Sequence, residues 1–207
     1  MKTMFQKVVC AVMLTALFMP FSRAQEPSKQ REAGITFSSL NSFGITYRFG
    51  NEKAMWRINS LIADYTNSES ENSDQKRTLL NVDAVVSFGR EYRTQLTDRF
   101  DFRYGADVSF RFQLDRSELE DKTGTYSDPA TSETLRYAPG INAVLGFNYA
   151  INDHFLVGAE FMPGIRYSIG TGTDRNFGDT EDTTTDLSDF SARLNSTSGM
   201  LSLVYRF

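Results

Sequence analysis

Apolar side chains at every second position are the feature of this sequence that most constrains its fold. The clearest case is residues 100–112, FDFRYGADVSFRF, where apolar residues occupy the even positions and mostly polar or small residues the odd ones. A period of two places alternate side chains on opposite faces of a β-strand. The alternation recurs from residue 34 to residue 207 without a competing helical stretch, so we expect an all-β chain.

Breaks in the alternation predict seven apolar spans and two kinds of connector. The spans are residues 34–49, 56–65, 80–88, 100–112, 135–149, 155–169 and 187–207. The short connectors are residues 50–53, 89–98 and 150–154, and the long polar loops are residues 66–77, 115–133 and 170–186. In the last span the apolar stripe changes phase, which predicts a β-bulge near residues 195–198.

Short turns on one side and long loops on the other are typical of a transmembrane β-barrel. The polar faces also carry small residues and charges of both signs, which suits a narrow interior. We therefore expect a closed, antiparallel, up-and-down barrel of eight strands with short periplasmic turns and long extracellular loops. A soluble sandwich would instead pack its apolar face inward.

Bacterial barrels of one chain have an even number of strands, so a first strand is missing from the seven spans. One solution pairs residues 28–38 with residues 42–49 across a tight turn at Leu40 and Asn41. The other uses polar residues 25–33 as a weak first strand. The stripe from Ile35 to Phe49 is unbroken, and the sequence leaves both solutions open.

Residues 1–24 predict a cleaved secretory signal, and residues 25–207 then form the single domain. Lys2 and Lys7 precede an apolar stretch, and Ser22-Arg23-Ala24 fits a cleavage site. The mature chain would have 19 basic and 26 acidic residues, which argues against a nucleic-acid partner. The one cysteine, Cys10, lies inside the signal, so we expect no disulfide.

At the terminal LSLVYRF and in spans such as FDFRYGADVSFRF and FLVGAEFMPGIRYSIG, the chain resembles the small outer-membrane β-barrels of Gram-negative bacteria, of the OmpX and OmpA-barrel kind. The resemblance covers residues 25–207. It implies an outer-membrane location and outer-membrane lipid as a partner. It also implies that Leu203, Tyr205 and Phe207 are read by the barrel-assembly machinery.

Two sets of side chains follow from the expected barrel. The lipid-facing set contains Phe100, Phe102, Tyr104, Val108, Phe110, Phe147 and Phe161. The interior set of charges contains Arg48, Arg57, Asp83, Asp101, Arg103, Asp107, Arg111, Glu160 and Arg166, with Arg206 in addition. We interpret the charges as a paired polar core that plugs the barrel. A pore lining that sets ion selectivity is the alternative.

The sequence supplies little for catalysis or for a cofactor. Its one histidine, His154, lies in a predicted periplasmic turn, and the acidic loops lack the spacing of a dedicated calcium site. We expect no cofactor, no metal and no enzyme. The main hypothesis is a non-enzymatic outer-membrane barrel that acts through its loops or in envelope structure. The alternatives are a small passive pore and a soluble exported barrel that binds an apolar ligand.

Overall fold

The fold was analysed in a computed structural model that describes residues 29–39, 42–126, 128–179, 181–193 and 199–207. The predicted signal at residues 1–24 therefore lies outside the described residues, as does the predicted turn at Leu40 and Asn41. Among the described residues, no helix has the length and apolar character needed to cross a bilayer.

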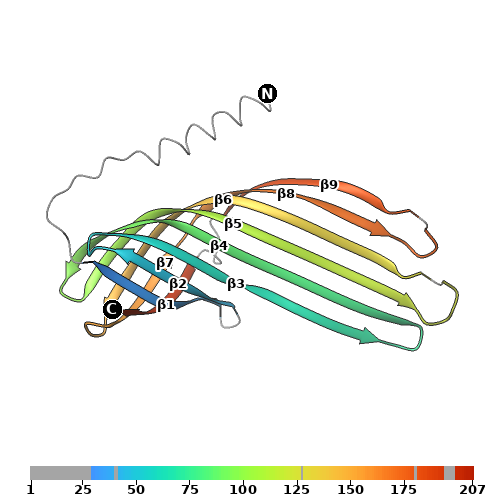
Figure 1. The fold of residues 1–207 in the computed structure, drawn as a ribbon, viewed down its shortest axis with the longest axis horizontal. Coiled ribbons are helices and arrows are strands. Elements are labelled where there is room, and N and C mark those ends of the chain that lie inside the picture. The colour runs from blue at the N-terminus through green and yellow to red at the C-terminus, as the bar shows by residue number, and fades with distance from the viewer. Residues whose placement is uncertain (1–28, 40–41, 127, 180, 194–198) are drawn as a thin grey trace, which may run out of the picture.

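Ten antiparallel strands make up the described chain (Figure 1). They are β1 (Gln30–Ser39), β2 (Ser42–Gly50), β3 (Ala54–Glu71), β4 (Gln75–Thr97), β5 (Phe100–Asp121), β6 (Ala130–Ala150), β7 (Phe155–Phe161), β8 (Gly164–Arg175), β9 (Thr183–Arg193) and β10 (Gly199–Arg206). The expected all-β, antiparallel class is confirmed.

The strand pairings divide the molecule into two regions. At one end, hydrogen-bonded neighbours run from β1 through β2, β3, β4, β5, β6, β7 and β10 back to β1. We call this circuit the ring; it comprises the described residues of 30–60, 86–110, 141–161 and 199–207. Beyond the ring, β3, β4, β5 and β6 continue and pair further with one another, and β8 and β9 join them. We call this part the extended sheet; it comprises the described residues of 64–83, 111–138 and 164–193. Its hairpins reach far past the short β1–β2 hairpin (Figure 1).

Two edges of the extended sheet have one described neighbour each. Residues 64–71 of β3 pair with β4 alone, and β9 pairs with β8 alone. The circuit of pairings is therefore complete only in the ring.

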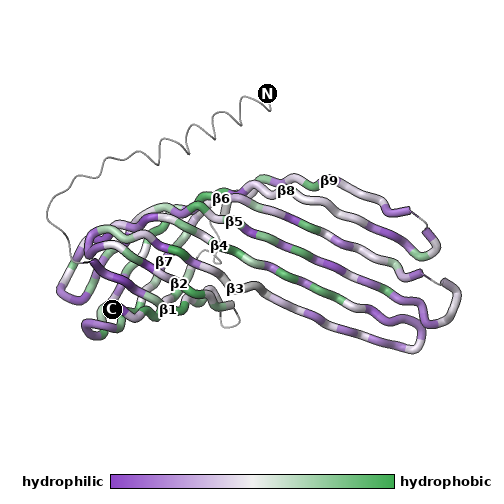
Figure 2. The backbone as a smooth tube through the Cα atoms, viewed as in Figure 1, coloured by the Kyte–Doolittle hydropathy of each residue, from purple (hydrophilic) through white to green (hydrophobic). Residues whose placement is uncertain are grey.

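The ring is inside out compared with a soluble protein. Large apolar side chains lie on its outer face, where Ile45 is 60% exposed and Val108 is 49% exposed. Most of the buried inward positions carry polar or charged groups, and the side chains of Arg48, Arg57 and Arg103 are fully buried. Hydrophilic residues dominate the far tips of the β3–β4 hairpin (Figure 2). This arrangement excludes the soluble sandwich, whose apolar faces would be buried.

The predicted loops are wrong over much of their length. β3 and β4 extend through most of residues 66–77, which leaves residues 72–74 as the turn, and β5, β6, β8 and β9 extend likewise into the other two polar segments. The predicted connector 89–98 is also largely strand, because β4 continues to Thr97. Backbone pairing persists in these segments while both faces are polar, so the apolar stripe used to mark strands disappears there.

The first solution for the missing strand is confirmed, because β1 pairs with β2 from Gln30 opposite Gly50 to Ser39 opposite Ser42. The register places Ile35 opposite Ile45 and Phe37 opposite Phe43. Odd positions thus face outward in both strands, which is why the stripe shows no break at the turn.

The span predicted at residues 155–169 is two strands. β7 and β8 are separated by Met162 and Pro163, and a proline cannot donate to a ladder. Both pair with β6, but β7 has β10 as its other neighbour and β8 has β9.

The predicted change of phase in the last span is confirmed. Phe190 of β9 pairs with the exposed Tyr167, whereas Leu201 of β10 pairs with Ala159. Outward positions are therefore even in β9 and odd in β10. The bulge expected near residues 195–198 lies outside the described residues.

Candidate functional site

Eight buried charged side chains meet inside the ring. We call them the interior cluster; they are Glu32, Arg48, Arg57, Glu91, Arg93, Arg103, Asp107 and Glu160. They come from β1, β2, β3, β4, β5 and β7 and occupy the inward positions of the two-residue period of those strands. Four arginines face four carboxylates, so the cluster is neutral when all members are ionised.

Arg57 is the best-connected cation of the interior cluster. Its Nη1 lies 2.9 Å from Glu160 and 3.3 Å from Glu91, and its Nε lies 3.2 Å from Asp107. Nη2 donates a second hydrogen bond to Glu160 at 3.1 Å. Glu160 belongs to β7 and Arg57 to β3, so this contact crosses the ring rather than joining adjacent strands.

Arg93 makes a second centre near the end of the ring with the short turns. Its two terminal nitrogens donate to the two oxygens of Glu32, at 2.7 Å each, in the two-pronged geometry that arginine forms with carboxylates. Nη2 also donates to Glu91 at 2.6 Å. Arg103 approaches Glu91 at 3.0 Å, and Arg206 approaches Glu32 at 3.1 Å.

Arg48 is held by charge rather than by direct hydrogen bonds. Its guanidinium lies 3.6–3.9 Å from Glu32, Glu91 and Glu160, and none of its nitrogens has a hydrogen-bond partner within the described chain. A cation equidistant from three carboxylates offsets their mutual repulsion. Removing one member of such a buried group leaves an uncompensated charge.

The structure brings together five of the nine charges predicted for the interior, namely Arg48, Arg57, Arg103, Asp107 and Glu160. Asp83 and Arg111 form a separate, partly exposed pair in the extended sheet. Asp101 is half-buried near the end of the ring, opposite Asn148. Arg166 lies in β8 opposite Gly140 and Ser191, and is thus also in the extended sheet.

Sequence reasoning missed three members of the interior cluster, Glu32, Glu91 and Arg93. Glu91 and Arg93 follow Ser87 at even spacing on β4, so extending the inward stripe past Gly89 would have found them. The predicted connector at residues 89–98 ended that stripe too early. Glu32 was hidden in the polar segment whose strand assignment stayed open.

The predicted lipid-facing residues lie on the outer face. Tyr104, Val108, Phe110, Phe147 and Phe161 are exposed, while Phe100 and Phe102 are half-buried, each with its ring centroid 5.3 Å from that of Phe147.

The residues of the predicted assembly signal lie on the same outer face. Leu203, Tyr205 and Phe207 are exposed there, and the Tyr205 ring packs edge-on against Phe155 at 5.2 Å.

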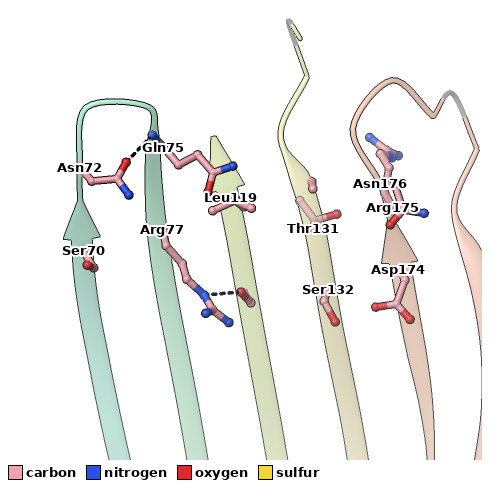
Figure 3. A pocket seen from close by; sticks show the side chains of 12 residues that line it. Ser70, Asn72, Gln75, Arg77, Leu119, Thr131, Ser132, Asp174, Arg175 and Asn176 are labelled. Atoms are coloured by element: carbon pink, nitrogen blue, oxygen red, sulfur yellow. Dashed lines mark hydrogen bonds between the residues drawn. The ribbon is translucent and has the colours of Figure 1, made fainter. Parts of the chain in front are cut away.

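A polar recess of about 710 Å³ lies at the far end of the extended sheet. Nε of Arg77 on β4 lies 3.4 Å from the hydroxyl of Ser117 on β5. Figure 3 shows Arg77 on the same side of the sheet as Ser132 of β6 and Asp174 of β8. Its lining residues are Ser70, Asn72, Gln75, Arg77, Ser117, Leu119, Ala130, Thr131, Ser132, Asp174, Arg175 and Asn176. All twelve lie in the three segments that the sequence analysis predicted as long polar loops.

Other candidate chemistry has less structural support. His154 lies in the exposed 151–154 turn, where its ring stacks on Tyr205 and its Nδ1 lies 3.1 Å from the carbonyl oxygen of Arg206. Within the described ranges, no three histidine, cysteine or acidic side chains gather in a way that would hold a metal ion. The acidic residues of the predicted loops are instead spread along strands β5, β8 and β9 and their turns.

Comparison with protein-family models and with curated proteins gives no match. Among solved structures, the chain is similar to a major outer membrane protein from Thermus thermophilus, with a TM-score of 0.46, 10% identity, and coverage of 87% of this chain and 100% of that one. It is also similar to Neisserial surface protein A, with a TM-score of 0.30, 16% identity, and coverage of 86% of this chain and 93% of that one. A third similar structure is Ail, the attachment invasion locus protein of Yersinia pestis, with a TM-score of 0.33, 13% identity, and coverage of 88% of this chain and 100% of that one.

Proposed function

We propose that the chain is a non-enzymatic outer-membrane protein whose strands form an eight-span β-barrel. In this interpretation β7 with β8 is one span and β9 with β10 is another, which gives the even number that such barrels require. The apolar outer face of the ring would contact acyl chains, and the short turns would face the periplasm. Closure of the ring satisfies the backbone groups that lipid leaves without partners.

The observation that supports a closed rather than a conducting barrel is the interior cluster. Its four arginines and four carboxylates are buried and reach one another across the ring from six strands. An eight-stranded ring is just wide enough for side chains to fill it. We therefore propose that the ring is an anchor and that the extended sheet, with its hairpins outside the membrane, performs the function.

Conductance separates this proposal from the passive pore. Purified protein reconstituted in planar bilayers should give no steady ohmic steps, and regular steps at neutral pH would favour the pore.

Cell fractionation tests the location: we expect recovery with the outer membrane and a shift in gel mobility between unheated and boiled samples. Extraction without detergent would favour the soluble exported barrel and contradict the proposal.

Assembly is a separate part of the proposal. The outward row Leu203, Tyr205 and Phe207 on and after β10 matches what the resemblance implies for the barrel-assembly machinery. Replacing Phe207 by Ser should lower the amount of folded protein in the outer membrane while leaving refolding of the purified chain in detergent unchanged. Equal loss in both measurements would indicate a role in stability instead.

A further inference from the structure

The recess at the far end of the extended sheet continues the inner face of the ring. Ser117 lies ten residues beyond Asp107 on β5, at an even spacing, and the pairing of β5 with β6 has no register shift between them. Both side chains therefore lie on the same face of the sheet. At the rise of a strand, ten residues place the recess about 33 Å from the interior cluster.

The lining of the recess consists mainly of groups that both donate and accept hydrogen bonds. Ser117 pairs directly with Ser132, and Ser132 pairs with Asp174, so two hydroxyls and a carboxylate form one row across three strands. Other lining residues add a hydroxyl and three amides, from Ser70, Asn72, Gln75 and Asn176. Amides and hydroxyls match a ligand whose own groups both donate and accept.

The charges of the recess balance. Arg175 is paired with Asp182, whose Oδ1 lies 2.6 Å from its Nε. Arg77 donates to the neutral Ser117 at 3.4 Å, and the carboxylate of Asp174 offsets its charge. Neither an anion nor a cation is therefore favoured by the net field of the site.

An aromatic pair lies beside the recess. The ring of Tyr126, between β5 and β6, stacks on the ring of Phe177, between β8 and β9, with centroids 5.2 Å apart. Phe177 directly follows the lining residue Asn176. The pair therefore joins the β5–β6 and β8–β9 hairpins, whose strands supply Ser117, Ser132 and Asp174 to the lining.

We propose that the recess binds a neutral oligosaccharide. This inference rests on the proposed function, since it assigns a ligand class to the sheet outside the membrane. The volume is in the range of small-ligand sites, and the hydroxyls and amides of the lining suit a hydroxyl-rich ligand. The charge balance favours a neutral saccharide over an acidic one.

The experiment uses the full-length chain, purified in detergent and shown to be folded by its heat-dependent gel mobility. Fluorescently labelled maltohexaose, mannohexaose and chitohexaose are titrated and followed by anisotropy, with a labelled heparin hexasaccharide as the anionic comparator. We expect at least one neutral probe to bind. Its affinity should change little between about 0.1 M and about 1 M salt, a range over which charge interactions are strongly screened.

Two variants with matched controls locate the site. Ser132→Trp fills the recess and should weaken binding by at least about ten-fold, whereas Glu133→Trp, on the opposite face of the same strand, should leave binding unchanged. Asp174→Ala removes an acceptor without adding bulk and should also weaken binding, while Asp186→Ala should not. These variants leave the ring intact, so folding serves as an internal check.

Three outcomes would overturn the inference. They are failure of every neutral probe to bind, binding that Ser132→Trp leaves intact, and binding confined to the heparin probe and abolished by salt. Because binding is measured on purified protein, its failure is distinguishable from a failure of the outer-membrane proposal. That proposal stands or falls on fractionation and heat-dependent mobility.

Discussion

Arg103 and Arg111 lie on the same face of β5, eight residues apart, but they find their partners in different ways. Arg103, in the ring, is fully buried and contacts Glu91 on β4 and Glu160 on β7, from two different strands. Arg111, in the extended sheet, keeps 22% of its side chain exposed and, among the described residues, forms its ion pair with Asp83 on the adjacent β4. In the closed ring, an inward side chain can contact strands on the opposite side. In the open extended sheet, a side chain can contact only the strands next to its own.

The comparison shows that the same kind of residue has a different energetic role in each region. A charge buried in the ring depends on several partners of opposite sign. When one member is removed, its partners stay buried away from water without a compensating charge, which lowers the stability of the fold. A charge in the extended sheet retains contact with water, so its pair contributes little.

The largest expected effect comes from removing a central cation of the ring. Arg57→Met should lower the free energy of unfolding by about 3–5 kcal/mol, because Glu91, Asp107 and Glu160 lose their shared partner. Arg111→Met should cost about 1 kcal/mol or less. Urea titration in lipid vesicles, followed by the fluorescence of Trp56, measures both, and equal losses would remove the distinction between the regions.

A smaller effect is expected from a charge on the outer face. Val108→Arg places a cation where we propose acyl chains and should cost about 2–4 kcal/mol near the middle of the membrane. Thr78 lies in the extended sheet, paired with Glu69 on one side and Glu118 on the other. The control substitution Thr78→Arg should change the free energy of unfolding by no more than about 0.5 kcal/mol. The same titration applies, and a larger loss at position 78 would mean that lipid covers that part of the sheet.

Shortening a hairpin tests whether the ring folds without the tip of the extended sheet. Ser117 and Ser132 are directly paired, so residues 118–131 can be replaced by an Asn-Gly turn. We expect the shortened chain to keep its heat-dependent gel mobility and its thermal transition, because the interior cluster is unchanged. Failure to fold in detergent would show that the tip of the sheet is required to close the ring.

The smallest effect is a local dependence on pH at the tip of the β5–β6 hairpin. The side chain of Thr123, together with backbone N–H groups of Thr123, Tyr126 and Thr125, donates to Asp121 and lowers the pKa of its carboxyl below the ordinary value. The contribution to stability is therefore complete above the unfolded-state pKa and is lost as pH falls through the folded-state pKa. A carboxyl NMR titration should show a higher pKa for Asp121 in Thr123→Val, and an unchanged pKa would contradict this account.

The period of two was enough to predict the strand class, the facing of the ring and most of its buried charges. From Arg103 to Phe110 the outward even positions are exposed and the inward odd positions are buried or half-buried, as predicted, because the apolar side chains of this stretch lie on one face of the strand. The same rule failed at residues 66–77, where both faces of the strands are polar and the alternation carries no information.

The recess could not be predicted for the same reason. Its residues come from β3, β4, β5, β6 and β8, and the pairing of Ser117 with Ser132 and of Ser132 with Asp174 depends on register set elsewhere in the strands. A polar sequence specifies register weakly, whereas the apolar stripes of the ring specify it strongly. Five of the eight members of the interior cluster were accessible to sequence reasoning because they alternate with those stripes on the opposite face of the same strands.

The incomplete circuit of the extended sheet has a consequence for how copies of the chain meet. Residues 64–71 of β3 and the whole of β9 each leave one side without a described neighbour, and unpaired strand edges can template the pairing of another chain. Glu69 and Glu71 on the β3 edge form ion pairs with Lys76 and Lys122, and the β9 edge carries Asp186 and Asp189. Charged side chains along both edges discourage edge-to-edge pairing of two copies, because they would have to lose water before the strands could form hydrogen bonds.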